Sequence, residues 1–317
     1  MAINLDKIQQ WKEDVAKSVD FYNNWFLKFA PQTYKETRAN TADKVLEALE
    51  LSHYFAHISP DNLKENPSIL AILRMTTRPP IARDRLIGLS GVSPNLVSSM
   101  EKGVLPTRMD SAVLDEQLGR ISAVFEQLAD TELFPWLLEK RVPAQGEKDL
   151  AAVIVADRLC GMVADPIIRN AQEQRQLEKI GSWLDSKGYK QRKSGQTATI
   201  DTLEAGTYSF RFNVPVIIGT DEHRVNIPVD VAIRPKDTSR KPILIEAKSA
   251  GDFTNTNKRR KEEAVKYSQL KSTYGDDIPF LLFLCGYFDS GYLGYEAAEG
   301  IDWIWEHRMG DLEALNL

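Results

Sequence analysis

Cysteine and histidine are scarce in this sequence, which has two cysteines and four histidines among 317 residues. Cys160 and Cys285 lie far apart and form no C-x-x-C motif, which argues against a cysteine zinc site and against a disulfide framework. His53 and His57 have the one-turn spacing of two metal ligands on a helix, but Tyr54 stands where a zinc protease carries its glutamate. We therefore interpret these histidines as ordinary helical residues and expect no zinc.

Long apolar runs are missing as well. Residues 1–12 are polar and charged, and they have no apolar segment of the kind that a signal peptide needs. The longest apolar stretch, residues 278–286, is much shorter than the roughly 20 residues that cross a bilayer. Scarce cysteine suits a reducing compartment. We expect a soluble cytoplasmic protein that has no membrane partner.

Positive charge is not in excess either, because the formal net charge is −5. This balance disfavours a uniformly basic nucleic-acid binder, but phosphates are neutralised locally, so the distribution of charge matters more than the total. Residues 236–271 contain ten Lys and Arg against five Asp and Glu, a local charge of +5, and residues 74–108 contain six against two, or +4. These segments are either DNA-binding surfaces on an acidic body or two solvated faces.

The hydrophobic pattern changes near residue 160. With 317 residues, of which 43% are hydrophobic, the chain is long enough for two domains with sizeable cores. Apolar residues recur at helical spacing in the first part, for example Trp11, Val15, Val19 and Tyr22. We predict a mostly α-helical N-terminal region, residues 1–160, and a second domain, residues 161–317.

The second domain mixes the two kinds of secondary structure. Apolar periodicity and glycine positions predict helices at residues 166–187, 258–274 and 295–307. Extended segments are predicted at residues 189–193, 208–218, 225–233, 242–247 and 278–288. This order predicts an α/β fold in which helices flank a mixed central sheet.

One group of residues in this domain has the chemistry of phosphodiester hydrolysis. Asp230 belongs to one predicted strand, and Glu246 and Lys248 end the next as the only E-x-K triplet in the sequence. Strand alternation places Glu246 and Lys248 on the same face of the sheet. Carboxylates on neighbouring strands can hold Mg²⁺, and a lysine beside them can orient or deprotonate a water molecule. The alternative is a surface salt bridge at a strand end.

A polar loop and the start of a basic helix follow Lys248. Four consecutive cations, residues 258–261, oppose the helix dipole at an N-terminus, and a nearby DNA phosphate would explain them. Compensation by Glu262 and Glu263 is the alternative. The candidate DNA contacts of this segment are Thr254, Asn255, Asn257, Lys258, Arg259 and Arg260.

Residues 81–106 have the pattern of a helix-turn-helix. The turn is formed by residues 91–93, and Pro94 takes the first position of a second helix, where proline is favoured. Leu96, Val97 and Met100 would pack inward, which leaves polar side chains free to meet base edges in the major groove. A plain helical hairpin would give the same pattern. The candidate DNA contacts here are Arg83, Arg85, Asn95, Ser98, Ser99 and Lys102.

The segment from residue 211 to residue 275 resembles the XamI family of type II restriction endonucleases, which is similar to the PD-(D/E)xK nuclease superfamily. Residues 229–233 and 245–263 carry the resemblance most specifically, and residues 77–86 resemble the N-terminal half of that family. The literal Pro-Asp pair of the superfamily is absent here, because Val229 separates Pro228 from Asp230. The proline has no chemical role, so this departure does not change the interpretation.

The resemblance implies Mg²⁺-dependent cleavage of both strands of double-stranded DNA at a short palindromic site. It makes Asp230 and Glu246 the metal ligands and Lys248 the water-orienting base or charge stabiliser. Many relatives in the superfamily add an acid from the first core helix, for which Glu178 is our candidate, although an exposed glutamate in an ion pair would look the same. Palindromic sites favour two-fold symmetric enzymes, so we expect a homodimer.

Two other functions share some of these features. A structure-specific or repair nuclease of the same fold would keep the acidic cluster but recognise the shape of DNA. A transcriptional regulator would use the helix-turn-helix beside an inactive sheet. The intact set of Asp230, Glu246 and Lys248 argues against the regulator.

Overall fold

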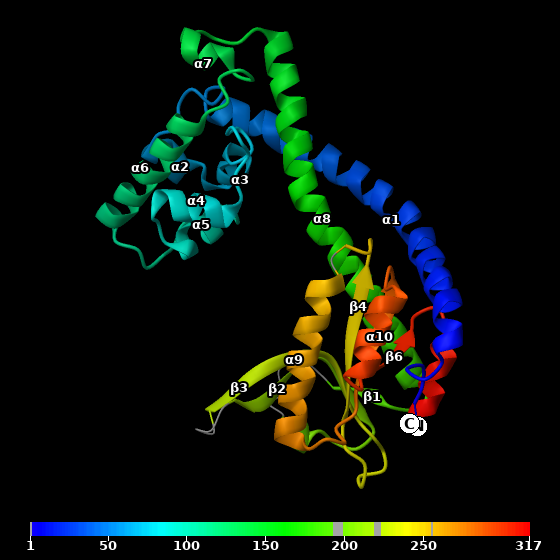
Figure 1. Cartoon of the computed structure of the whole chain (residues 1–317). Coiled ribbons are helices and arrows are strands. Elements are labelled where there is room, and N and C mark those ends of the chain that lie inside the picture. Colours follow the sequence, from blue (N-terminus) through cyan, green and yellow to red (C-terminus); the bar gives the residue numbers. More distant parts are fainter. Residues whose placement is uncertain (1, 193–198, 219–222, 255) are drawn as a thin grey trace. The chain divides into compact units, whose positions relative to one another are not determined.

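The chain folds into two compact units in a computed structural model (Figure 1). Its described residues are 2–192, 199–218, 223–254 and 256–317, without the side chains of residues 223 and 257–260. The sheet unit contains Met1–Phe29 and Ile168–Leu317, and the helical unit contains Ala30–Ile167. Helices α1 (Ile8–Leu51) and α8 (Gln145–Ser186) each include a boundary between the units. The predicted domain boundary at residue 160 therefore lies within α8, and the first 29 residues group with the sheet.

The sheet unit is built on a six-stranded sheet with the strand order β1-β2-β3-β4-β5-β6. Strand β3 runs antiparallel to both of its neighbours, β2 and β4. Strand β1 runs parallel to β2, and strands β4, β5 and β6 run parallel to one another. This confirms the predicted mixed sheet. The strands are β1 (Lys190–Gln191), β2 (Thr207–Ile218), β3 (His223–Arg234), β4 (Ile243–Ala250), β5 (Phe280–Gly286) and β6 (Asp302–Trp305).

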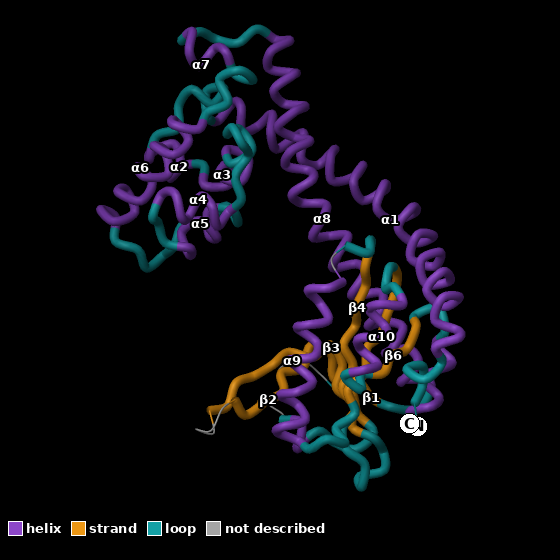
Figure 2. Tube along the Cα trace, viewed as in Figure 1, coloured by secondary structure: helices purple, strands orange, loops and turns teal. Residues whose placement is uncertain are grey.

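Helices cover both faces of this sheet (Figure 2). On one face, Leu177, Ile180 and Leu184 of α8 pack against residues of β3, β4 and β5. On the other face, the core includes Leu270 of α9 (Thr256–Tyr274) and Leu293 of α10 (Ser290–Ala298). Burial of apolar side chains on both faces explains why β5 consists entirely of buried residues.

The predicted closing helix at residues 295–307 is wrong in its second half. Helix α10 ends at Ala298, Gly300 follows with φ 77°, and the chain then forms strand β6. Trp303 and Trp305 pack into the core on the α9 and α10 side, whereas Ile304 packs into the core on the α8 side. This alternation is that of a strand buried on both faces, which a short apolar run does not distinguish from a helix.

The predicted start of a helix at Pro166 is also wrong. Helix α8 begins at Gln145 and continues without interruption through Pro166. A proline inside a helix removes one backbone donor and usually marks a boundary, which is why the sequence suggested a start there. Helix α1 likewise continues through Pro31.

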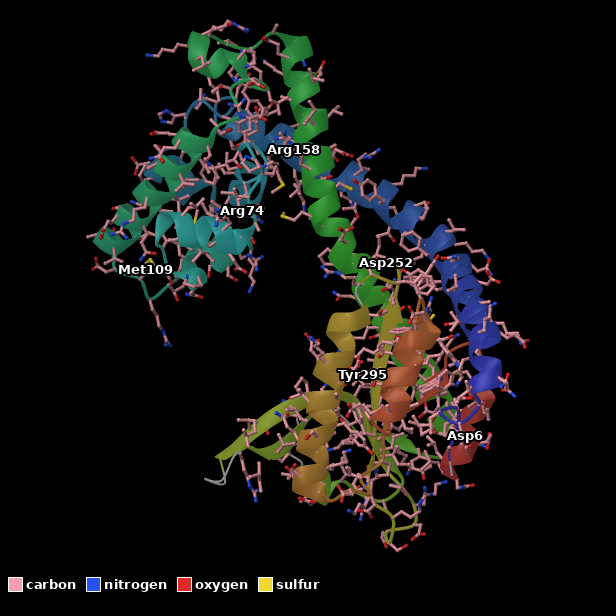
Figure 3. The ribbon with its side chains drawn as sticks, in the orientation of Figure 1. Asp6, Arg74, Met109, Arg158, Asp252 and Tyr295 are labelled. Carbon is pink, nitrogen blue, oxygen red and sulfur yellow. The ribbon has the colours of Figure 1, made fainter. Side chains whose placement is uncertain are left out.

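Among its described residues, the helical unit has an apolar core formed by short helices together with parts of α1 and α8, such as Val45 and Val155. Arg74, labelled in Figure 3, lies within it at 3% exposure, and its guanidinium donates to Glu101 and to the carbonyl oxygen of Ile81. Among the described residues, no helix is both long and apolar enough to cross a membrane. The short helices are α2 (Pro60–Glu65), α3 (Leu70–Leu73), α4 (Arg83–Ser90), α5 (Pro94–Met100), α6 (Ser111–Leu128) and α7 (Pro135–Glu139).

Candidate active site

Asp230 is fixed at the point where the pairing between β3 and β4 ends. The paired residues run from Ile233 with Ile243 to Val231 with Ile245. At the next position, Oδ2 of Asp230 accepts a hydrogen bond from the backbone N–H of Ala247 at 2.8 Å. The side chain of Asp230 thus binds the neighbouring strand directly, and this contact holds its carboxylate next to Glu246.

The side chains of β3 change from one face of the sheet to the other at this contact. Val229 packs into the core on the α9 and α10 side, whereas Val231, two residues later, packs into the core on the α8 side. Across the strand pair, Arg211 lies between the residues paired with Val229 and Val231, and its φ is 48°. A positive φ in a non-glycine residue within a strand is strained, and such strain is often found near functional sites. Asp230 lies at this switch between faces.

Glu246 and Lys248 share the face of β4 that is turned toward α9, as strand alternation predicted. Nζ of Lys248 donates to Oε1 of Glu246 at 3.0 Å. A second lysine, Lys266 of α9, donates to the same oxygen at 2.8 Å and to the carbonyl oxygen of Pro228 at 2.8 Å. Sequence reasoning missed Lys266, because its place beside Glu246 depends on how α9 packs on the sheet.

Three buried polar side chains lie behind Lys248. Nζ of Lys248 is 3.7 Å from Oε1 of Glu263 on α9, and the other oxygen of Glu263 accepts from the hydroxyl of Tyr292 at 2.6 Å. Glu263, Tyr292 and Glu296 are 1%, 2% and 0% exposed, so all three are removed from water. The sequence pattern gives no sign of this cluster, because its members come from separate helices.

The electrostatics of the cluster follow from its burial. Burial raises the pKa of Asp230 to about 6, and the charge of Glu246 raises it as well, although the N–H of Ala247 and the charge of Lys248 oppose this. Burial also lowers the pKa of Lys248, but Glu246 and Glu263 more than offset this, so that its pKa is raised. Lys248 therefore carries its proton at neutral pH.

The carboxylates present suit a hard divalent cation. Oε2 of Glu246 is buried and has no hydrogen-bond partner among the described residues, and a buried charged oxygen of this kind is costly without a partner. Mg²⁺ binds carboxylate oxygens and water, so Asp230 and Glu246 have the right donor atoms. Within the described part of the chain, no three His, Cys, Asp or Glu residues gather as a metal-binding group. The fit therefore rests on these two carboxylates.

The helix-borne acid that acts on Asp230 is Glu173, and the structure does not bring Glu178 to the cluster. Glu178 is exposed, and its Oε1 accepts from Gln174 at 3.0 Å. Glu173 lies on the same helix, pairs with Arg211 at 2.9 Å, and adds to the rise in the pKa of Asp230. The sequence could not separate the two, because both glutamates are polar positions of one helical pattern, although Glu173 is half-buried in the structure and Glu178 is exposed.

The predicted DNA contacts beyond β4 are only partly within the described residues. Thr254 is exposed, and its backbone N–H donates to Asp252, which is labelled in Figure 3 close to the end of β4. Asn255 lies outside the described residues. The backbone of Asn257, Lys258, Arg259 and Arg260 is in the first turns of α9, and their side chains lie outside the description.

The two predicted helices of residues 81–106 are present as α4 and α5. Gly91 ends α4 with φ 63°, and Leu96, Val97 and Met100 of α5 are buried as expected. Ser93 holds the position before α5, but its side chain makes no capping hydrogen bond there. Glu101 pairs with Arg83, while the side chain of Arg85 is exposed.

The polar residues of α5 and of the turn after it face outward. Asn95 of α5 and Lys102, two residues beyond its end, are exposed, whereas Ser98 and Ser99 are half-buried. Asn95 and Ser99 line a hollow of about 600 Å³ together with Arg108. The structure therefore presents these side chains to solvent in the helical unit, and their contact with DNA stays a prediction.

A mixed sheet with helices on both faces, carrying acidic residues and lysine on its central strands, is the architecture of a restriction-endonuclease-like core. The chain belongs to the XamI restriction endonuclease family, which matches residues 53–305. It is similar to the type II restriction enzyme SalI from Streptomyces albus G, with 53% identity over 314 residues, 98% of this chain and 99% of the relative. The class of the protein is therefore that of a type II restriction endonuclease, a site-specific deoxyribonuclease.

Two further similarities are weaker. The type II restriction enzyme XamI from Xanthomonas campestris pv. amaranthicola is 25% identical over 209 residues, which are 65% of this chain and 68% of that enzyme. A crystal structure of protein VC1899 from Vibrio cholerae aligns with 90% of this chain and 56% of its own, at 14% identity and a TM-score of 0.29. That TM-score is too low to establish a shared fold.

Proposed function

We propose that this enzyme hydrolyses one phosphodiester bond in each strand of double-stranded DNA, at a short palindromic site, in a reaction that requires Mg²⁺. The observation that carries the proposal is the convergence of Asp230, Glu246 and Lys248 from two neighbouring strands. The partnerless buried oxygen of Glu246 supports a cation at this point. The similarity to type II restriction enzymes supports DNA as the substrate.

Each residue of the cluster has a separate role in this proposal. Asp230 and Glu246 hold Mg²⁺, which when bound supplies Lewis acidity and lowers the pKa of water. Lys248 stays protonated and orients the attacking water while its charge stabilises the negative transition state. Lys266 adds a second positive charge on the same side of Glu246.

Recognition of the DNA sequence belongs to the helical unit in this proposal. Helix α5 presents Asn95, Ser98 and Ser99, and Lys102 follows it in the next turn. Asparagine can pair with adenine and lysine with guanine. The basic start of α9 supplies contacts to phosphates, which position the DNA without specifying its sequence. Arg85 of α4 adds a further exposed cation in the helical unit.

A homodimer is the assembly that this substrate favours. A palindromic site has two-fold symmetry, so two copies of one chain can each cut one strand. Sedimentation on a cognate duplex should give twice the chain mass of 35.8 kDa in addition to the DNA. A complex that contains a single chain would contradict this part of the proposal.

Digestion of plasmid DNA tests the proposal as a whole. The purified enzyme with Mg²⁺ should give discrete fragments, and sequencing their ends should reveal one symmetric site cut in both strands. EDTA should stop the reaction, and the variants D230N, E246Q and K248A should each reduce cleavage at least about a hundredfold while keeping DNA binding. Smearing or shortening from the ends would instead indicate a structure-specific or repair nuclease. DNA binding without cleavage by the unaltered enzyme would indicate a regulator.

A further inference from the structure

Glu263, Tyr292 and Glu296 form a buried polar cluster that the assigned roles do not use. Glu263 belongs to α9, and Tyr292 and Glu296 belong to α10, next to Tyr295, which is labelled in Figure 3. The hydroxyl of Tyr292 donates to Glu263 at 2.6 Å, and Glu263 is 3.7 Å from the ammonium group of Lys248. The cluster therefore connects the interior of the unit to the predicted catalytic lysine.

Such a cluster is expensive to keep for stability alone. Removing an ionised carboxylate from water costs several kcal/mol, and apolar side chains of similar volume often serve a core equally well or better. Glu296 is fully buried between these groups. Because these buried acids lead to Lys248, their effect on the position of Lys248 explains them better than a contribution to stability does.

We propose that Glu263 is a positioning residue for DNA cleavage, which holds the ammonium group of Lys248 in place and is itself held by the hydroxyl of Tyr292. This inference rests on the proposed function, since it assumes that Lys248 acts in the reaction. Glu263 does not touch the DNA or the metal in this arrangement. It acts only through Lys248.

The need for a second anchor follows from the contacts of Glu246. Its Oε1 already accepts from both Lys248 and Lys266, and the proposed function gives the same carboxylate to Mg²⁺. Glu263 is the carboxylate near Lys248 that the metal does not require. It can therefore keep the lysine in position whether or not Glu246 is engaged.

Two polar groups face the carboxylate of Glu263. They are the ammonium group of Lys248 on β4 and the hydroxyl of Tyr292, which donates a hydrogen bond to it. Burial raises the pKa of Glu296 to about 9, and the charge of Glu263 contributes to this rise. Glu296 is therefore protonated at neutral pH, so that it adds no second negative charge beside Glu263.

Three variants test the inference by single-turnover cleavage of a cognate duplex. E263Q keeps the shape of the side chain but removes its charge, and it should lower the cleavage rate constant by roughly tenfold to 100-fold, the effect of a misplaced catalytic group. The dissociation constant for the duplex, measured with Ca²⁺, should change less than about threefold, because Glu263 does not touch DNA. Y292F should have a smaller effect, and the double variant E263Q/Y292F should be no slower than E263Q alone, because Tyr292 acts through Glu263.

Controls separate a positioning role from a structural one. Y274F removes a half-buried tyrosine hydroxyl that donates to the carbonyl oxygen of Pro215, away from the cluster, and should cleave at the unaltered rate. If E263Q and Y292F lower the unfolding temperature but leave the cleavage rate unchanged, the inference is overturned. Independent, multiplying effects of the two changes on the rate would overturn it too.

Failure of the inference can be told apart from failure of the proposed function. If K248A and E246Q abolish cleavage while E263Q and Y292F do not slow it, only the positioning role is lost. If K248A itself cleaves normally, the proposed function fails first. Y292F keeps both carboxylates, so it provides a second measurement if E263Q does not fold.

Discussion

Lys266 lies against Glu246, with its Nζ atom 2.8 Å from Oε1 of that carboxylate. The same ammonium group reaches the carbonyl oxygen of Pro228, so it is held between two oxygen atoms. Lys248 donates to Oε1 of Glu246 as well. In the absence of a divalent cation, two lysines thus neutralise the carboxylate that we propose as a ligand, and they compete with any cation for it.

Replacement of Lys266 by methionine should therefore strengthen metal binding. Loss of a cation in direct contact with the ligand should tighten Ca²⁺ binding about fivefold, equivalent to about 1 kcal/mol, when measured by calorimetry without DNA. Without metal, the same variant should unfold at a lower temperature, since Glu246 loses a partner. K261M, at an exposed position of α9, is the matched control and should change the affinity less than twofold. Equal effects of the two changes would show that only the overall charge matters.

Glu173 and Glu178 lie on the same helix but should differ in their effect on the reaction. The charge of Glu173 acts on Asp230, whereas Glu178 contacts Gln174 at an exposed position. E173Q should raise the Mg²⁺ concentration for half-maximal cleavage several-fold, because a negative charge near the cation is lost. E178Q should leave it within about twofold. The reverse order of effects would restore Glu178 as the helix-borne acid.

The part of the site that lies on one strand could be predicted from the sequence. Glu246 and Lys248 are two residues apart at the end of an apolar strand, and the contact between them confirms that they share a face. The contact of Asp230 with Ala247 was harder to foresee. It depends on the change of face at Arg211, whose positive φ has no signature in an ordinary alternating segment.

Residues that reach the site from helices could not be predicted in the same way. Lys266 and Glu263 are three residues apart on α9, and both face the sheet, which places them on the buried side of a helix that reads as mostly charged. Charged residues on a helix usually lie on its solvated face, so the sequence pattern predicted that Lys266 and Glu263 face solvent. The predicted closing helix at residues 295–307 was wrong for a related reason, because the short apolar run that forms β6 is compatible with either a helix or a strand. Packing decides both cases.

Glu296 should make the stability of the metal-free enzyme depend on pH. Its pKa is raised from 4.5 to about 9 in the folded protein, by burial first and then by the charge of Glu263. The stability that its proton provides is fully present below pH 4.5 and is lost as the pH rises through 9. Between pH 7 and pH 9 the free energy of unfolding should therefore fall by up to about 1.4 kcal/mol for each pH unit.

Two variants isolate this contribution. E296Q should flatten the decline, since the amide does not titrate, and urea unfolding in EDTA at a series of pH values measures the slope. The charged groups that face Glu296 are Glu263 of α9 and Glu299, which follows the end of α10, with Tyr292 beside them. E299Q changes an exposed residue and should leave most of the slope in place. An unchanged slope in E296Q would show that other groups cause the pH dependence.

Helix α5 should determine which bases the enzyme accepts. Asn95 is exposed on this helix and Lys102 is exposed just after it, while Leu96, Val97 and Met100 anchor the helix in the core. A side chain that pairs with a base edge contributes about 1 to 3 kcal/mol of discrimination, so N95A and K102A should each relax preference at one base pair by roughly fivefold to 100-fold. Cleavage of a library with randomised positions, followed by sequencing of the ends, measures this directly.

A change confined to phosphate contacts would give a different result. Loss of such a contact weakens binding to all sequences about equally and reduces its salt dependence, but leaves the preferred site unchanged. E126Q on the exposed face of α6 serves as the control and should alter neither property. If N95A and K102A cut the same sequences in the same proportions as the unaltered enzyme, α5 does not read bases. The sequence would then have to be read by other residues, with the loop from Gly251 to Thr254 after β4 as the next segment to test.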